Sequence, residues 1–147
     1  MKRLPNITPI SLVERSPGPG PLIGAHMSIA GGMHRALERA LKVRARVVQV
    51  FTRNATQWKA RKLSRAEVST FRGAWLRSGL HSIVAHDSYL INLASPRAAL
   101  RRRSIEALAE ELSRCEALGI PYLVSSRDPF QRFEDGARKS RGSARAH

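Results

Sequence analysis

The sequence is poor in cysteine, in long apolar runs and in acidic residues, and the first two shortages exclude whole classes of protein. Cys115 is the one cysteine among 147 residues, so no intrachain disulfide can form and a disulfide-stapled fold is excluded. No stretch approaches the ~18 consecutive apolar residues that a membrane-spanning helix needs. The N-terminus lacks the apolar core of a signal peptide. We therefore expect a cytoplasmic protein without a membrane partner.

The shortage of acidic residues leaves a large positive charge. The chain has 11 Asp and Glu against 26 Lys and Arg, a formal net charge of +15. Residues 22–124 alone hold 17 basic and 7 acidic residues, so +10 of this excess lies outside the ends. Such a balance favours a polyanionic partner, most often a nucleic acid, and the plainer alternative is an arginine-rich surface.

The two ends differ in composition from the rest of the chain. Residues 1–21 end in an alternating Pro-Gly run, which predicts a flexible leader because proline cannot continue a helix or a central strand. Residues 125–147 hold six basic and three acidic residues with little apolar periodicity, which predicts a disordered basic tail. This tail is either a nucleic-acid-binding segment or an out-of-frame translation of a GC-rich gene, and we favour the second.

Between the ends, apolar strands alternate with amphipathic helices. Strands are predicted at Leu22–His26, Val47–Phe51, Ser82–Ala85 and Pro121–Val124. Helices are predicted from Met33, after a capping box at Ser64 and Glu67, and after Ser95 as N-cap, with Gly79 and Gly119 as helix ends. The order β-α-β-α-β-α-β predicts an α/β fold with parallel strands. Four strands make half of an eight-stranded barrel, which takes ~250 residues, and a small open sheet is the alternative.

Each predicted helix has an apolar face that we expect to be buried. A spacing of three and four residues defines these faces. They comprise Met33, Ala36, Leu37, Ala40 and Leu41; Val68, Phe71, Trp75 and Leu76; and Ile105, Leu108, Leu112 and Cys115.

Polar residues follow the third strand, at His86 and Asp87. A His and an Asp are costly to bury without partners. In barrels of alternating strands and helices, the chemistry lies at the carboxyl ends of the strands. A lone His in such a place is most often bonded to a neighbouring backbone group, but the motifs elsewhere in the chain favour a functional role.

Four motifs together resemble the endonuclease IV family, the zinc-dependent apurinic/apyrimidinic endonucleases. They are Ile23–Gly32 (IGAHMSIAGG), Phe51–Trp58 (FTRNATQW), His86–Leu93 (HDSYLINL) and Arg114–Gly119 (RCEALG). The resemblance covers residues 22–124. It implies the N-terminal half of a (β/α)8 TIM barrel.

The resemblance also implies an activity and its site. The family hydrolyses the phosphodiester 5′ to abasic sites in double-stranded DNA, using three zinc ions held by His, Asp and Glu side chains. His86 corresponds to the first zinc ligand. Gln57 and Tyr89 correspond to loop residues inserted into the bent DNA, and we add Asn54 and Trp58 as DNA-binding candidates. Thr56 stands where the family often has Arg.

Elementary chemistry agrees with a DNA-binding role for these loops. Planar side chains stabilise unstacked nucleotides, and basic side chains supply phosphate affinity. The loop after the second strand carries four basic side chains, Arg53, Lys59, Arg61 and Lys62. Packing under the loop is an equal alternative for Trp58. For His26, a structural role or a role in supporting the metal ligands is expected.

The number of zinc ligands is too small for the family's chemistry. A tight zinc site needs at least three protein ligands, and the chain offers His86 and little else. Where the family continues with a His-Pro-Gly or His-Thr-Gly stretch, this chain has Ser125–Pro129. We therefore expect a truncated chain without a full zinc cluster, inactive alone, and assign no catalytic residue and no protein partner. The alternatives are a non-catalytic DNA-binding remnant, a fragment of a sugar isomerase or epimerase barrel, and a relic gene.

Overall fold

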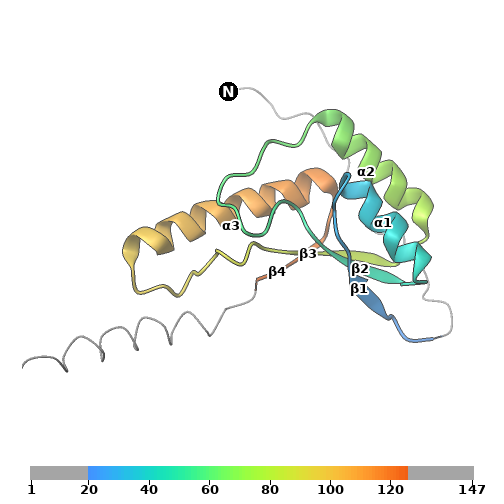
Figure 1. Cartoon of the computed structure of the whole chain (residues 1–147), viewed down its shortest axis with the longest axis horizontal. Coiled ribbons are helices and arrows are strands. Elements are labelled where there is room, and N and C mark those ends of the chain that lie inside the picture. Colours follow the sequence, from blue (N-terminus) through green and yellow to red (C-terminus); the bar gives the residue numbers. More distant parts are fainter. Residues whose placement is uncertain (1–19, 126–147) are drawn as a thin grey trace, which may run out of the picture.

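The computed structural model describes residues 20–125, so the expectations for the leader and for nearly all of the tail concern residues outside this range. Strands and helices alternate along the described residues (Figure 1). In chain order they are β1 (Gly24–His26), α1 (Met33–Lys42), β2 (Val47–Phe51), α2 (Arg65–Ser78), β3 (Ser82–His86), α3 (Ala98–Leu118) and β4 (Tyr122–Val124). None of these helices has the length and apolarity that crossing a membrane requires.

The strands form one parallel sheet in the order β1-β2-β3-β4. Val47 pairs with Gly24 on one side and with Ser82 on the other, and Phe51 pairs with His86. The helices lie together on one side of this sheet (Figure 1). The predicted α/β fold and the order of the first four strands of a barrel are therefore confirmed.

Alternate residues of the central strands build the core. Val48 and Val50 of β2 and Ile83 and Ala85 of β3 are buried, whereas the residues between them are half-buried. Because side chains alternate across a strand, the buried set faces the helices and the other set faces away from them. The helices contribute Ala36, Leu37, Phe71, Trp75, Cys115 and Leu118 to this core, among others. Burial raises the pKa of the Cys115 thiol to about 11, in keeping with its expected packing role.

The ends of α2 follow the sequence signals. The Ser64 hydroxyl accepts the Glu67 amide N–H at 3.2 Å, and the Glu67 carboxylate accepts the Ser64 amide N–H at 3.0 Å. This is the predicted capping box. Gly79 ends α2 with φ 72° and Gly119 ends α3 with φ 79°, a backbone region that favours glycine.

Three details of the helices differ from the predictions. Helix α3 begins at Ala98 rather than directly after Ser95, and the Ser95 hydroxyl instead accepts the Arg97 amide N–H at 3.3 Å in the preceding turn. Leu41 and Leu76 were expected on buried faces, but both are exposed, Leu76 at 58%. Each follows a buried residue of its helix, Ala40 or Trp75, and lies on the solvent side of the apolar stripe.

The predicted apolar face of α3 is wrong for two of its four residues. Ile105 and Leu112 are 54% and 53% exposed. The buried face instead consists of Ser104, Ala107, Glu111, Arg114, Cys115 and Leu118. Three of the first four of these residues are polar. The reason is the surroundings of the helix: its last turn packs into the core, whereas Ser104, Glu111 and Arg114 form hydrogen bonds to loops.

We predict opposite effects for two glycine-to-alanine substitutions. In Gly24→Ala the new methyl group overlaps the Cγ2 atom and the carbonyl oxygen of Val47 on the paired strand, so the protein loses about 1–3 kcal/mol of stability. In Gly73→Ala, inside α2, the methyl group lies 3.2 Å from the end of the flexible Arg77 side chain, and stability rises by up to about 1 kcal/mol. Chemical denaturation of both variants measures the difference, and equal stabilities would contradict the steric argument.

Candidate functional site

Ring side chains meet at the carboxyl ends of the first three strands. His26 ends β1, Phe51 ends β2 and His86 ends β3. The ring centroid of Phe51 lies 4.5 Å from that of His26 and 5.4 Å from that of His86. Tyr89 follows β3, with its ring centroid 5.1 Å from Phe51 and 5.8 Å from His86. We call these four residues the ring cluster.

The two histidines of the ring cluster are each fixed through Nδ1. In His86 this atom lies 2.8 Å from the carbonyl oxygen of Asp87. Because a carbonyl oxygen can only accept, Nδ1 of His86 carries the hydrogen in this bond. In His26, Nδ1 lies 3.0 Å from the side-chain oxygen of Gln49 on the neighbouring strand. His26 therefore ties β1 to β2, which agrees with the structural role expected for it.

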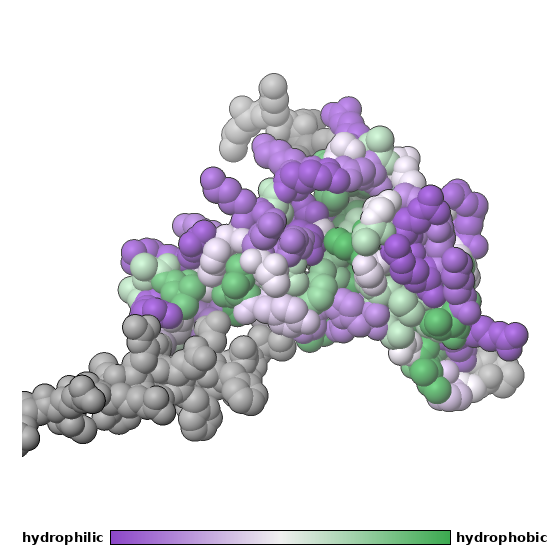
Figure 2. Space-filling view, viewed as in Figure 1, coloured by the Kyte–Doolittle hydropathy of each residue, from purple (hydrophilic) through white to green (hydrophobic). Residues whose placement is uncertain are grey.

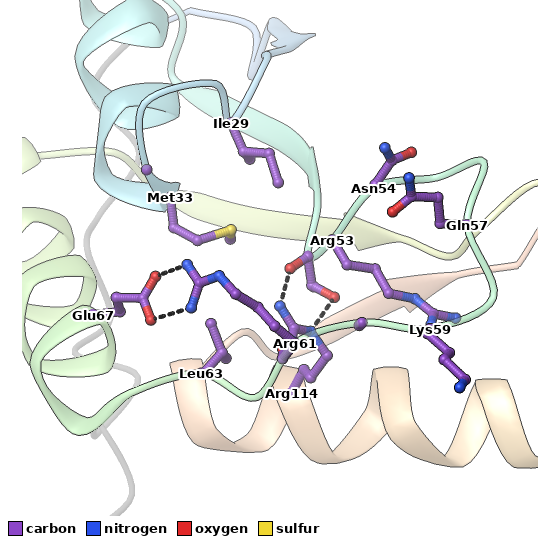
Figure 3. Close-up of a pocket in the computed structure, with 13 residues that line it drawn as sticks. Ile29, Met33, Arg53, Asn54, Gln57, Lys59, Arg61, Leu63, Glu67 and Arg114 are labelled. Carbon is purple, nitrogen blue, oxygen red and sulfur yellow. Dashed lines mark hydrogen bonds and ion pairs between the residues drawn. The ribbon is translucent and has the colours of Figure 1, made fainter.

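The β2–α2 loop (residues 52–63) carries three of the predicted DNA-binding residues. Asn54 and Gln57 are exposed and lie close together on the loop (Figure 3). The Asn54 side-chain oxygen accepts the amide N–H of Thr56 at 2.9 Å and its hydroxyl at 2.8 Å. Trp58 is half-buried, and the Arg103 guanidinium of α3 lies over its ring at 4.4 Å from the centroid.

One buried hydrogen bond joins this loop to the segment after β3. The Ser88 hydroxyl donates to the carbonyl oxygen of Ala55 at 2.6 Å. Ser88 precedes Tyr89, and Ala55 lies two residues before Gln57. This bond therefore brings together the two segments that the sequence motifs single out.

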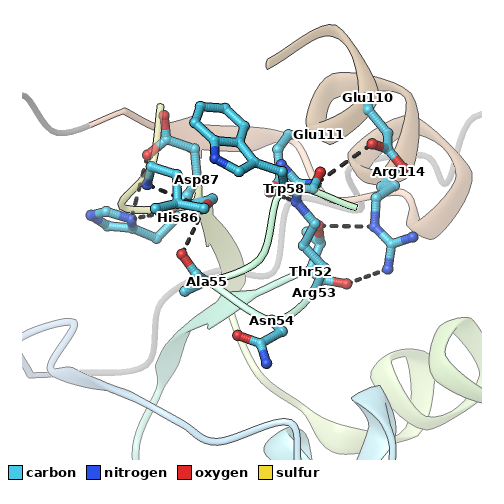
Figure 4. Close-up of polar contacts among 12 residues, drawn as sticks. Thr52, Arg53, Asn54, Ala55, Trp58, His86, Asp87, Glu110, Glu111 and Arg114 are labelled. Carbon is cyan, nitrogen blue, oxygen red and sulfur yellow. Dashed lines mark hydrogen bonds and ion pairs between the residues drawn. The ribbon is translucent and has the colours of Figure 1, made fainter. Parts of the chain in front are cut away.

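A network of buried polar side chains holds the β2–α2 loop against α3 (Figure 4). Glu111 accepts hydrogen bonds from Thr52 and from Arg53, the latter at 2.6 Å. Arg114 donates to the Thr52 hydroxyl at 3.2 Å, to the Thr52 carbonyl oxygen and to the Arg61 carbonyl oxygen at 2.9 Å. Burial lowers the pKa of the Arg114 guanidinium below its ordinary value.

A cavity of about 420 Å³ lies between this loop and the start of α1 (Figure 3). Its charged lining residues are Arg53, Lys59, Arg61, Glu67 and Arg114. Arg61 and Glu67 form a two-bond ion pair across the cavity. The hydrogen bonds from Arg61 hold the pKa of the Glu67 carboxyl well below its usual range.

Comparison with known proteins identifies the family to which the chain belongs. Residues 33–145 match the model of the xylose isomerase-like TIM barrel family. The chain belongs to this family.

Relatives within this barrel family include proteins named as probable endonuclease 4. The protein of that name from Geobacter sulfurreducens is 49% identical over 102 residues, which cover 69% of this chain and 34% of the relative. The crystal structure of endonuclease IV from Thermus thermophilus superposes with a TM-score of 0.68 at 34% identity, over 86% of this chain and 48% of that one. The chain thus spans about a third of the length of the curated relatives it matches.

The predicted resemblance to the endonuclease IV family is confirmed for the N-terminal part of the barrel. A D-psicose 3-epimerase structure also superposes, with a TM-score of 0.53 at 17% identity, over 83% of this chain and 47% of that one. At that identity the likeness concerns the barrel fold alone.

Within the barrel, the structure brings the predicted site residues into two adjoining groups. His86 and Tyr89 lie in the ring cluster, and Tyr89 is 56% exposed. Asn54, Gln57 and Trp58 lie on the β2–α2 loop. The Ser88–Ala55 hydrogen bond joins the two groups.

The residues of this barrel segment do not fit a zinc cluster. Among residues 20–125, no group of three His, Cys, Asp or Glu side chains could hold a metal ion. Asp87, next to His86, is buried and accepts a hydrogen bond from the Ser125 hydroxyl at 2.6 Å. The ring of His86 is surrounded by Phe51, Tyr89 and His26. The described residues therefore lack the ligands that zinc-dependent hydrolysis needs.

The structure corrects one expectation and adds residues that sequence reasoning missed. Arg53 was grouped with the phosphate-binding side chains of the loop, but it is only 5% exposed and is paired with Glu111. Thr52, Glu111 and Arg114 were not identified as site residues. Glu111 and Arg114 are three residues apart, the spacing of an ordinary surface ion pair, so no local pattern marked them as buried.

We predict that the 147-residue chain does not bind zinc tightly. One imidazole without second and third ligands gives weak affinity, so dialysis against micromolar zinc followed by elemental analysis yields far less than one ion per chain. His86→Ala and the control His26→Ala then retain equally little zinc. Stoichiometric zinc that is lost only in His86→Ala would contradict the prediction.

Proposed function

We propose that this chain is an endonuclease IV-type DNA repair protein, and that its described part binds double-stranded DNA at abasic sites. The observation that supports this most is the hydrogen bond between Ser88 and Ala55. It holds the Tyr89 segment and the β2–α2 loop together at the carboxyl edge of the sheet, where barrels of this class place their sites.

The exposed side chains of these segments suit a duplex with a missing base. The Tyr89 ring packs edge-on against Phe51, with an interplanar angle of 70°, and more than half of its surface stays open to solvent. It is thus held in place yet available for stacking on an unpaired base. Gln57 and Asn54 offer amide donors and acceptors from the neighbouring loop.

The charge of the segment supplies affinity that does not depend on sequence. Lys59 and Lys62 are exposed on the β2–α2 loop, which also carries Gln57. Phosphate contacts of this kind dominate non-specific DNA affinity and weaken as salt rises. Arg53 and Arg114 are excluded from this role because their hydrogen bonds hold the loop.

Cleavage 5′ to the abasic site, with zinc, requires ligands beyond His86. The residues described provide no group of three. We therefore propose that they recognise the lesion and that this chain alone does not cut it. A non-catalytic DNA-binding protein is the second candidate function, favoured by the same ligand count.

We predict selective, salt-dependent binding to duplex DNA that contains an abasic-site analogue. Fluorescence anisotropy should show tighter binding to this duplex than to an intact one, with log affinity falling by about 0.9 per phosphate contact as log salt rises. Tyr89→Ala should weaken binding to the abasic duplex about tenfold, because a lost stacking contact costs about 1–3 kcal/mol.

Tyr122→Ala is the matched control. Tyr122 is a second tyrosine of nearly equal exposure, 55%, but begins β4 instead of following β3. We expect Tyr122→Ala to bind the abasic duplex with the same affinity as the unchanged protein. Equal losses in both variants, or equal affinity for intact and abasic duplexes, would contradict it.

A nicking assay tests the cleavage part separately. We predict that the purified chain with added zinc leaves an abasic duplex intact while still binding it, because the metal ligands among the described residues are too few. Zinc-dependent nicking that a chelator abolishes would overturn this prediction and leave the DNA-binding prediction standing.

A further inference from the structure

Glu111 occupies an unusual place for a carboxylate. It lies in the middle of α3 and is only 1% exposed, so water reaches almost none of it. A buried carboxylate is tolerated when it is paired and its oxygens accept hydrogen bonds. The partners of Glu111 therefore indicate what its burial stabilises.

Both carboxylate oxygens of Glu111 are bound by the first two residues of the β2–α2 loop. Oε2 accepts from the Thr52 hydroxyl, and Oε1 accepts from Nε of Arg53 at 2.6 Å. Thr52 directly follows the last residue of β2. Glu111 thus fixes the direction in which the chain leaves the sheet.

The same network reaches the middle and the end of the loop. Arg53 donates through Nη1 to the Trp58 carbonyl oxygen at 2.9 Å, and Arg114 bonds both Thr52 and the Arg61 carbonyl oxygen. Figure 4 shows Glu111, Arg53 and Arg114 converging beside Trp58. The loop is therefore held at its start, middle and end, and Asn54 and Gln57 lie between these points.

The charges of the network depend on Glu111. Two buried guanidinium groups, Arg53 and Arg114, flank one fully buried carboxylate. Glu110 also faces Arg53, at 3.5 Å, but its side chain is 41% exposed and water screens it. Without the Glu111 charge, two cations would remain close together in a partly dry site, and the contacts that dock the loop on α3 would weaken.

We propose that Glu111 is a positioning residue: from inside the protein it docks the β2–α2 loop on α3 and so presets the loop for DNA. Its exposure of 1% excludes direct contact with a DNA ligand. The effect of Glu111 on DNA binding rests on the proposed function, whereas its effect on docking of the β2–α2 loop does not. A loop that is already ordered before binding gives higher affinity, because binding does not have to supply the free energy of ordering it.

The experiment uses the full chain with Trp75→Phe, so that Trp58 is the one tryptophan. Trp58 reports docking of the loop because its ring packs under Arg103 of α3. Acrylamide quenching of Trp58 fluorescence measures docking without DNA, and anisotropy with the abasic duplex measures binding. Circular dichroism and thermal unfolding establish that each variant is folded.

Glu111→Gln keeps the shape of the side chain and removes its charge, and Glu106→Gln is the matched control. Glu106 is exposed on the same helix, and both changes raise the net charge by one. General attraction to DNA would therefore tighten binding slightly in both variants. We expect Glu106→Gln to follow this trend. Glu111→Gln should instead bind about tenfold more weakly, because it loses charge-assisted hydrogen bonds, and Trp58 quenching should rise.

Thr52→Val is a second variant that keeps every charge. It removes the hydroxyl that donates to Glu111 and accepts from Arg114. We expect it to loosen Trp58 in the folded protein, and Thr52→Ser, which keeps the hydroxyl, to recover docking. If Glu111→Gln does not fold, the Thr52 pair decides the proposal.

The outcomes separate this proposal from the proposed function. Folded variants in which Trp58 quenching is unchanged would overturn the positioning role, even if stability falls. Higher quenching in Glu111→Gln and Thr52→Val, but not in Glu106→Gln, supports it. If the unchanged protein fails to bind DNA, the proposed function is wrong, while the quenching measurements still decide whether Glu111 docks the loop.

Discussion

The parallel pairing of β2 with both of its neighbours is the constraint on which the rest of the structure depends. Because β1, β2 and β3 run in the same direction and in register, His26, Phe51 and His86 end at one edge. The loops that follow must begin there too. The ring cluster and the two segments proposed to bind DNA are consequences of this one arrangement.

The sequence predicts the local elements well, since each depends on near neighbours. The bounds of β2, the capping box at Ser64 and the glycine at the end of α2 follow from residues within a few positions of one another. The parallel sheet follows from the alternation of strands and helices. The position of His86 at a strand end also follows from a local motif.

The polar interior of α3 could not be predicted in the same way. Glu111 and Thr52 are 59 residues apart in the chain, and no local pattern relates them. Periodicity favoured Ile105 and Leu112 because it assumes that the buried side of a helix faces an apolar core. Most of α3 instead faces the backbone and polar groups of loops, where hydrogen bonds replace apolar contacts.

The buried network also shows that the loop is not an independent module. Its conformation is specified jointly by its own residues and by Glu111 and Arg114 on a helix that begins more than thirty residues later. A protein engineer who grafts the β2–α2 loop of a related barrel onto this one would therefore have to transplant these two helix positions with it. The loop and the two positions on α3 that hold it would have to change together.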